Sequence, residues 1–418
     1  MTIANIITRR KTCRLCGSGQ LELVLPLEPT PVAEKYVTRE KLGEPTLKFP
    51  LDMYMCRDCG HVQLLDVIDP RFLFLDFTYA SAGTKALVQS FEDAAELTCT
   101  RYAIPANGLV VDIGSNDGSL LKCFQKRGYR ILGVDPASAV AKRAIEAGIP
   151  TIVDFLTPEV AAAVRREHGK SAVVCAFNVF AHADDLGGMI DSIRSLLAPD
   201  GLFVFEASYL LDIVDRVLLG TIFHEHLSYH SIKPLATFLK RHGLELIDVQ
   251  RNLVQGGSVV GTAQLAGGPH PASESVPQIL DLEASRRLDK PETMKQFGAQ
   301  LLQVKDRLAE MIGQFICQKK TIWGYGAARS ATTFLAQMDL GKVIAAIVDD
   351  SPEKQGKFSP GDHIPILPTS ALYEQRPDYT FLLAWIHAQR ITENNQLYLR
   401  RGGHFILCFP EVEIIGNK

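Results

Sequence analysis

Residues 110–118 read VVDIGSNDG, and this stretch decides the fold. It is an apolar run that ends in an aspartate and two spaced glycines, and the segment after it, 119–128 (SLLKCFQKRG), has a helical pattern. Glycine carries no side chain, so a turn that contains it can pass close to a ligand. The stretch therefore predicts a strand, a ligand-binding turn and a helix, as in doubly wound α/β sheets. A purely structural turn is the alternative.

The spacing of the glycines indicates which ligand the turn accepts. Residues 112–118 follow the pattern DxGxxxG and not the GxGxxG of dinucleotide-binding turns. S-adenosylmethionine has no pyrophosphate to cradle, so the pattern favours this methyl donor over NAD. Asp112 and Asn116 are expected to contact its amino-acid or ribose part, while Gly114 and Gly118 leave room for it.

Two later acidic residues extend the predicted donor site. The apolar run 129–135 (YRILGVD) ends at Asp135, about twenty residues after the turn, where a carboxylate accepts hydrogen bonds from ribose hydroxyls. The run 150–155 (PTIVDF) carries Asp154, which we expect to receive the adenine amino group.

The neighbouring sequence repeats this pattern of a strand followed by a helix. Between about 76 and 270, apolar runs alternate with helical patterns; four of the runs are 109–114, 129–135, 171–180 and 201–208. Strands that alternate with helices indicate βαβ units and a parallel sheet. A polar stretch with Pro, Gly and Ser at 266–277 (AGGPHPASESVP) indicates a linker.

The C-terminal region predicts a long helix and a second α/β unit. An apolar stripe at spacings of four and three marks the helix: Phe297, Leu301, Val304, Leu308, Met311 and Phe315. Four strand candidates follow, at 321–330, 343–351, 379–385 and 404–409. In the first, TIWGYGAARS, Gly324 and Gly326 end a strand before a helix, a geometry that binds phosphate. The alternative is a second Rossmann-like unit with no ligand.

The first quarter of the chain contains two matched cysteine pairs. CRLCG at 13–17 and CRDCG at 56–60 are both CxxCG turns, in which the glycine permits a left-handed backbone beside the sulfurs. Four protein thiolates complete a tetrahedral zinc site, so we expect a structural metal on Cys13, Cys16, Cys56 and Cys59. The gap of 39 residues between the pairs requires an inserted loop. Thioredoxin-like redox pairs and unliganded cysteines are the weaker alternatives.

The totals set limits on the class of protein. The chain has 418 residues, of which 46% are hydrophobic and 22% charged, and its net charge of −3 excludes a strongly basic nucleic-acid footprint. It contains no signal-peptide pattern and no apolar run of about 20 residues, so we expect a cytoplasmic enzyme with no membrane partner. We predict a small β-rich zinc-binding module at 1–75, a methyltransferase domain at 76–270, and a helix with a C-terminal Rossmann-like α/β domain at 271–418.

Together these motifs resemble the sugar C-methyltransferases of deoxysugar biosynthesis. Besides the cysteine turns and the DIGSNDGSLL segment at 112–121, the chain carries motifs of that family in the family's order: HVQL at 61–64, YAS at 79–81, GVDPA at 133–137, NVFAH at 178–182, HEHLSY at 224–229, GGS at 256–258 and WGYGAA at 323–328. The resemblance covers nearly the whole chain. It implies a class I methyltransferase core, with a zinc-bearing N-terminal lobe and a C-terminal domain that helps to hold a nucleotide sugar.

The resemblance also implies a reaction and a set of site residues. These enzymes methylate C3 of a nucleotide-linked 4-keto-6-deoxysugar, whose C3 proton lies next to a carbonyl and can be removed by a general base. His226 is the expected base and Glu225 its rival, while His182 or Tyr79 would donate to the O4 oxyanion. Asn178 would join the donor site, and the substrate would contact His224, Tyr325, Gly326, Ala327 and Arg329.

The chain departs from the family pattern at three positions. Phe223 stands where the family has Tyr, Val260 lies where an Arg is usual, and Ile386 follows LLAW in place of Asn. Each change removes a polar contact, which leaves open the nucleotide (dTDP or GDP) and the sugar. Methylation of a sugar nitrogen or oxygen, and a non-catalytic nucleotide-sugar binder, are the alternatives. The family is described as monomers or weak dimers.

The HEH run itself admits other readings. Its histidines are two residues apart, a spacing that a helix cannot place on one face, so a second metal site is not expected. A strand would place His224 and His226 on one face, and a loop over the cleft is equally compatible with the sequence.

Overall fold

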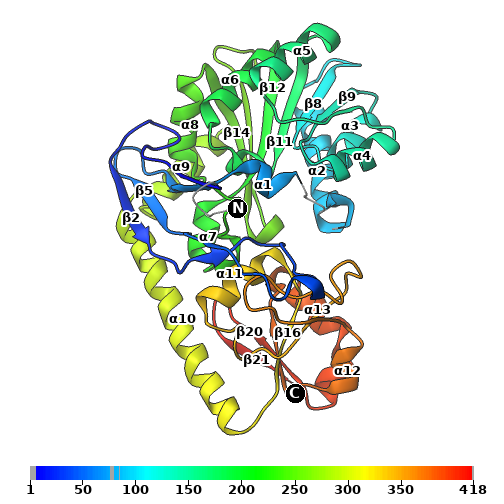
Figure 1. Ribbon diagram of the computed structural model, residues 1–418. Coiled ribbons are helices and arrows are strands. Elements are labelled where there is room, and N and C mark those ends of the chain that lie inside the picture. Colours follow the sequence, from blue (N-terminus) through cyan, green and yellow to red (C-terminus); the bar gives the residue numbers. More distant parts are fainter. Residues whose placement is uncertain (1–5, 76–79, 84, 417–418) are drawn as a thin grey trace. The chain divides into compact units, whose positions relative to one another are not determined.

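The computed structural model describes residues 6–75, 80–83 and 85–416, and the chain divides into two compact units (Figure 1). The first unit consists of Met1–Glu22, Met55–Leu211 and Leu227–Lys290, and the second of Leu23–Tyr54, Asp212–His226 and Pro291–Lys418. Each unit is therefore assembled from stretches that lie far apart in the sequence. In particular, most of the loop between the two cysteine pairs, Leu23–Tyr54, belongs to the second unit, although the cysteines belong to the first.

The first unit is built on a seven-stranded sheet in the order β10-β9-β8-β11-β12-β15-β14. The strands from β10 to β12 are parallel, and β15 runs antiparallel to both of its neighbours. This mixed, mainly parallel sheet confirms the predicted doubly wound core. Its strands are β8 (Leu109–Ile113), β9 (Arg130–Val134), β10 (Thr151–Ile152), β11 (Ser171–Phe177), β12 (Leu197–Ser208), β14 (Leu244–Asn252) and β15 (Ser258–Leu265).

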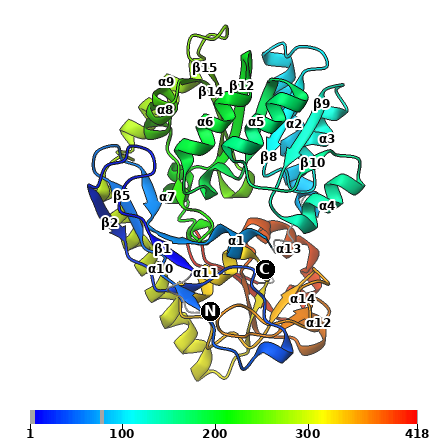
Figure 2. The same cartoon turned by 45° about the horizontal axis from the view of Figure 1, so that its top comes forward.

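Helices connect and cover these strands, with α5 packed beside α6 and α2 beside α3 (Figure 2). The central strands are buried on both faces, which explains why β8 and β11 are nearly continuous apolar runs. The helices of this part of the chain are α1 (Pro70–Phe74), α2 (Lys85–Arg101), α3 (Ser119–Gln125), α4 (Ser138–Glu146), α5 (Pro158–His168), α6 (Leu186–Leu196), α8 (Ile232–Arg241) and α9 (Ser275–Ser285).

The glycine-rich turn after β8 has the backbone that its sequence predicts. Gly114 and Gly118 both adopt left-handed φ angles, of 69° and 75°. A Cβ atom on Gly114 would lie 2.2 Å from the Val179 Cγ2 atom, so no larger residue fits there. The turn thus needs glycine for its conformation and for the close approach of the loop that follows β11.

The cysteine-bearing segments form short β-structure, as predicted. One four-stranded sheet has the order β13-β6-β5-β2, and β1 pairs antiparallel with β7. These strands are β1 (Ile7–Arg9), β2 (Leu21–Leu25), β5 (Met53–Cys56), β6 (Val62–Leu64), β7 (Asp66–Ile68) and β13 (Ser228–Tyr229). The pairing of β13 with β6 brings the segment that follows the HEH run next to the one that follows Cys59.

The second unit contains a six-stranded sheet in the order β18-β17-β16-β19-β20-β21, parallel except for β21. The four predicted strands are present, and β18 and β21 are additional. The strands are β16 (Ile322–Tyr325), β17 (Ile347–Asp349), β18 (Ile366–Pro368), β19 (Tyr379–Leu382), β20 (His404–Leu407) and β21 (Glu413–Ile415), with β3 (Thr30–Pro31) and β4 (Lys48–Phe49) paired separately. The shorter helices of this unit are α11 (Arg329–Gln337), α12 (Ala371–Gln375), α13 (Ala388–Asn394) and α14 (Gln396–Arg400). Helix α7 (Leu210–Asp215) begins in the first unit and ends in the second.

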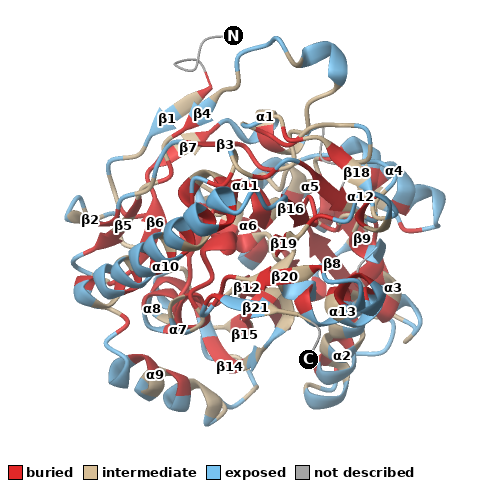
Figure 3. Cartoon of the chain, turned by 90° about the horizontal axis from the view of Figure 1, so that it is seen from below, coloured by how far each residue is buried: buried red, intermediate tan, exposed pale blue. Residues whose placement is uncertain are grey.

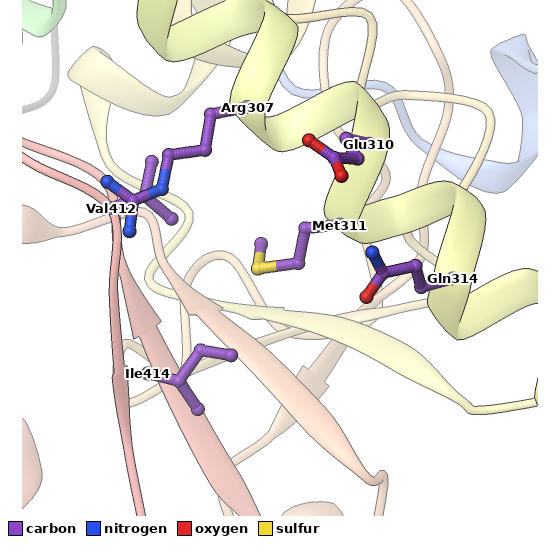
Figure 4. Close-up of a pocket in the computed structure, with 6 residues that line it drawn as sticks. All are labelled: Arg307, Glu310, Met311, Gln314, Val412 and Ile414. Carbon is purple, nitrogen blue, oxygen red and sulfur yellow. The ribbon is translucent and has the colours of Figure 1, made fainter.

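The predicted long helix is α10 (Pro291–Cys317), whose residues alternate between buried and exposed along its length (Figure 3). Its buried stripe follows the prediction except at Met311, where Ile312 is buried instead. Met311 is only partly buried, and it lines a hollow of about 450 Å³ between α10 and the C-terminal end of the chain (Figure 4). Throughout the described part of the chain, no helix combines the length and the apolarity that a membrane span requires.

Candidate active site

The four paired cysteines converge in the first unit. Their Sγ atoms all lie within 4.8 Å of one another, with 3.6 Å between those of Cys13 and Cys59 and 3.4 Å between those of Cys16 and Cys56. Ligand sulfurs about 2.3 Å from a tetrahedral zinc are spaced by about 3.8 Å, so this donor set fits the ion. Gly17 and Gly60 adopt left-handed φ angles, of 76° and 80°, which confirms the predicted role of both glycines.

The carboxylate of Asp135 organises the turn predicted to bind the methyl donor. Its Oδ2 atom accepts a hydrogen bond from the Asn116 backbone amide at 2.8 Å, and its Oδ1 atom accepts one from the Ala137 amide at 2.8 Å. Asp112 is a buried residue of the neighbouring strand β8. Its burial, together with the charge of Asp135, raises the pKa of Asp112 well above the usual value. Burial also raises the pKa of Asp135 itself.

The remaining predicted donor residues differ in their surroundings. Asn116 holds a left-handed φ of 51°, and its side-chain oxygen accepts hydrogen bonds from the amides of Ser81 and Asp117 at 3.0 and 2.9 Å. Asp154 is exposed and lies two residues beyond the end of β10, where its carboxylate caps the Phe155 amide at 2.7 Å. The structure thus brings Asp112, Asn116 and Asp135 together and leaves Asp154 at the surface.

A buried carboxylate that the sequence reasoning missed lies at the same edge of the sheet. Glu206, at the end of β12, accepts hydrogen bonds from the side-chain amides of Asn178 at 3.1 Å and Asn252 at 3.2 Å. Asn178 has a left-handed φ of 57°, and its backbone amide donates to the Glu206 carbonyl at 2.8 Å. Burial raises the pKa of Glu206 to about 7, and the two amides oppose this shift. A glutamate inside the otherwise apolar run 201–208 was the available signal.

The HEH run is a turn in the second unit, closed by a hydrogen bond from the His226 amide to the Phe223 carbonyl at 3.0 Å. His224 and Glu225 are buried, whereas His226 is only partly buried. The His224 Nε2 atom lies 3.2 Å from the Phe49 carbonyl, and burial lowers the pKa of this histidine to about 4. Burial raises the pKa of Glu225, and the charge of Arg329 opposes the shift.

His226 is held in one orientation by two contacts. Its Nδ1 atom lies 2.8 Å from the Thr221 carbonyl, and its ring packs on Phe223 with a centroid distance of 3.9 Å. A carbonyl only accepts hydrogen bonds, so Nδ1 must carry the proton, and in the neutral ring Nε2 bears the lone pair. The Arg329 guanidinium lies over the Phe223 ring, 5.4 Å from its centroid, and pairs with Glu34 at 3.1 Å.

The glycine turn of the second unit is already partly hydrogen-bonded. Gly326 has a φ of 95°, and a Cβ there would lie 2.4 Å from the Ala384 Cβ. The Ala327 amide donates to Asp349 at 2.7 Å, and the Tyr325 hydroxyl donates to Asp350 at 3.2 Å. The turn therefore presents two carboxylates next to the amides that the sequence assigns to phosphate binding.

His182 lies in the first unit, in the 3-10 turn Phe180–His182 that follows β11. Its ring stacks on that of Phe74, with centroids 5.6 Å apart and planes inclined by 15°. Tyr79, the other predicted oxyanion donor, lies outside the described residues.

Comparison with known proteins then assigns the family. Models of a zinc binding domain, a methyltransferase domain and a C-methyltransferase C-terminal domain match residues 13–74, 89–249 and 253–410. C-methyltransferase NovU from Streptomyces niveus is 34% identical over 407 residues, which span 97% of both chains. The chain belongs to the C-methyltransferase family. This confirms the resemblance drawn from the motifs, and with it a methyltransferase that uses S-adenosylmethionine and carries a zinc-binding cysteine cluster.

Two more distant proteins match a smaller share of the chain. The ubiquinone biosynthesis O-methyltransferase of Actinobacillus pleuropneumoniae serotype 7 (strain AP76) is 30% identical over 115 residues, 24% of this chain and 47% of that one. The structure of magnesium protoporphyrin IX methyltransferase from Synechocystis PCC 6803 with bound SAM covers 42% of this chain and 78% of its own, at 16% identity and a TM-score of 0.33.

Proposed function

We propose that this C-methyltransferase acts at C3 of a nucleotide-linked 4-keto-6-deoxysugar, with His226 as the general base. The observation that carries the proposal is the contact of the His226 Nδ1 atom with the Thr221 carbonyl, because it leaves the lone pair on Nε2. His226 removes the C3 proton, the carbonyl group at C4 takes up the electron pair as an enolate, and C3 then attacks the methyl group of the sulfonium. Sulfur leaves as the neutral thioether, and the carbonyl is restored.

Glu225 is the weaker candidate for the base because of its surroundings. It is 4% exposed, and burial raises its pKa, so the charged form that a base requires is disfavoured. The positive charge of Arg329, which lies over the Phe223 ring, opposes this rise in the pKa of Glu225. We assign Glu225 to the orientation of the HEH turn, and His182 with Tyr79 to stabilisation of the oxyanion at O4.

On the donor side, we propose that Asp135 binds the ribose hydroxyls of S-adenosylmethionine. Asp112, Asn116 and Asn178 complete the site with Gly114 and Gly118, whose backbone admits the ligand. The exposed Asp154 is the proposed adenine contact.

On the acceptor side, we propose that the C-terminal domain holds the nucleotide, dTDP or GDP, at the turn of Tyr325, Gly326, Ala327 and Arg329. The support is the arrangement of a glycine turn and a helix N-terminus at α11. His224 is buried against Phe49, so its predicted contact with the substrate requires movement of the turn. For this assignment of roles we keep the proposed zinc-binding module at 1–75, methyltransferase domain at 76–270, and helix with C-terminal domain at 271–418. We also propose that the enzyme works in the cytoplasm, where cysteine thiols stay reduced.

A substrate panel tests the proposal. The enzyme is incubated with S-adenosylmethionine and dTDP- or GDP-linked 4-keto-6-deoxysugars, with the matching 4-hydroxy sugars as controls that cannot form an enolate. We expect methylation of a keto sugar only, with the new methyl group on C3 by NMR. A methyl group on oxygen or nitrogen, or methylation of a 4-hydroxy sugar, would overturn the proposal.

A further inference from the structure

Arg14 is an unusual residue to find inside a zinc-binding turn. It lies between the ligands Cys13 and Cys16, and its side chain is completely buried although it carries a charge. The guanidinium donates to the Gln63 side chain and to the Leu227 carbonyl, each at 3.2 Å, and also to the Leu64 carbonyl. The backbone amide of Arg14 donates to the same Gln63 oxygen at 3.0 Å. All of these groups belong to the first unit.

The remaining face of the guanidinium reaches the loop that carries His182. The Arg14 Nε atom donates to the Asp184 Oδ1 atom at 3.0 Å. Arg10, just before the first cysteine, donates to the carboxylate of Asp184 at 3.1 Å and to its carbonyl at 2.9 Å. Two arginines of the zinc module therefore hold one aspartate, which lies two residues after His182.

A second contact from the cysteine-bearing part of the chain holds the His182 ring itself. Phe74, at the end of α1, stacks on this ring with nearly parallel planes. The His182 amide closes its turn by donating to the Val179 carbonyl at 2.8 Å. The imidazole thus packs against the Phe74 ring, and the backbone that carries it is held in a turn.

Fold stability alone is a poor explanation for Arg14. The buried Arg14 guanidinium loses its hydration, and an apolar residue of similar volume often stabilises a fold as well or better. A buried charge such as that of Arg14 favours the one arrangement in which its hydrogen bonds are made. Here that arrangement includes Asp184, in the loop that follows His182.

We infer that Arg14 is a positioning residue for His182: the zinc-binding turn fixes the guanidinium, and through Asp184 the guanidinium fixes the loop. The catalytic part of this inference rests on the role of His182 in the proposed function. The zinc module is then a support for the chemistry of methyl transfer in addition to a folding unit.

The test removes the anchored carboxylate and leaves the zinc ligands intact. Asp184 has 44% of its side chain exposed, so Asp184→Asn should leave the protein folded. Asp191→Asn is the matched control, because Asp191 is 51% exposed and pairs with Arg194 on α6, which follows the same loop. Zinc content, affinity for S-adenosylmethionine, kcat and the ring NMR signals of His182 are measured for both variants, with His182→Gln used to assign the signals.

We expect Asp184→Asn to keep its zinc and its donor affinity, to shift the His182 ring signals, and to lower kcat by about tenfold to a hundredfold. In a His182→Gln background, the same substitution should lower kcat little further. Unchanged ring signals in Asp184→Asn, or shifts of equal size in Asp191→Asn, would overturn the inference. If His182→Gln alone keeps full kcat, the proposed role of His182 fails, while the ring signals still decide whether Arg14 and Asp184 position it.

Discussion

The Asp135 carboxylate accepts a hydrogen bond from the Asn116 backbone amide at 2.8 Å, across the turn that follows β8. Its second oxygen accepts one from the Ala137 amide at the same distance. One side chain from the end of β9 therefore holds the backbone of the glycine-rich turn and is also the proposed ribose contact. Loss of this carboxylate should affect both the conformation of the turn and the ligand.

Substitution of Asp135 should weaken binding of the methyl donor. We expect Asp135→Ala to reduce the affinity for S-adenosylmethionine by about 1–3 kcal/mol, the cost of leaving buried polar partners without a hydrogen bond. Isothermal titration calorimetry measures this directly. Asp154→Ala is the comparison, because Asp154 is exposed; an equal loss in that variant would establish the adenine contact. Unchanged affinity in Asp135→Ala would move the ribose site elsewhere.

The cysteine cluster should hold one zinc ion per chain. Elemental analysis of the purified protein measures the stoichiometry, and a value well below one would contradict the assignment. Cys56→Ser should lower the thermal stability and the zinc content, because metal binding contributes to the folding free energy of such modules. Cys317→Ser is the control, since Cys317 is exposed and remote in sequence from the paired cysteines, and it should keep its zinc.

Glu206 should make stability depend on pH in a specific direction. Its pKa is raised from 4.5 to about 7 in the folded protein, so the native state binds the proton more tightly than the unfolded chain. The stabilisation by the neutral carboxyl is present at low pH and is lost as the pH rises from about 5 to beyond 7. Within this window the free energy of unfolding should fall by up to about 1.4 kcal/mol for each pH unit.

Comparison of the wild type with Glu206→Gln isolates this effect. The glutamine cannot ionise, so the stability of the variant relative to the wild type should rise between about pH 5 and pH 8. Urea denaturation at both pH values measures the difference. Glu245→Gln, which changes an exposed glutamate on β14, should follow the wild type. Parallel pH curves for Glu206→Gln and the wild type would show that the carboxyl is not buried in this way.

The strands and turns were predictable because their causes are local. β8 is an apolar run followed by glycines that must adopt positive φ, and both properties can be read from 110–118 alone. The CxxCG turns were predictable for the same reason. The error at Met311 is also local in origin: a helix of 3.6 residues per turn drifts relative to alternating spacings of four and three, so Ile312 faces inward near the end of α10.

The parts that sequence reasoning missed depend on contacts between distant segments. Glu206 is recognisable as a site residue only in the folded structure, where Asn178 after β11 and Asn252 at the end of β14 donate hydrogen bonds to its carboxylate. Likewise, nothing in CRLC indicates that its arginine reaches Asp184, 170 residues away. The loop between the cysteine pairs gives no local sign that it belongs to the unit of the C-terminal domain.

The central claim is that His226 forms an enolate before methyl transfer, and exchange of the C3 proton with solvent deuterium tests it most directly. The wild type should exchange this proton of a nucleotide-linked keto sugar in the absence of the methyl donor. His226→Asn should bind the sugar yet lose exchange and methylation together, by about 10²–10⁴-fold. Glu225→Gln should keep part of the exchange, because Glu225 only orients the turn. Exchange that persists in His226→Asn and disappears in Glu225→Gln would contradict the assignment.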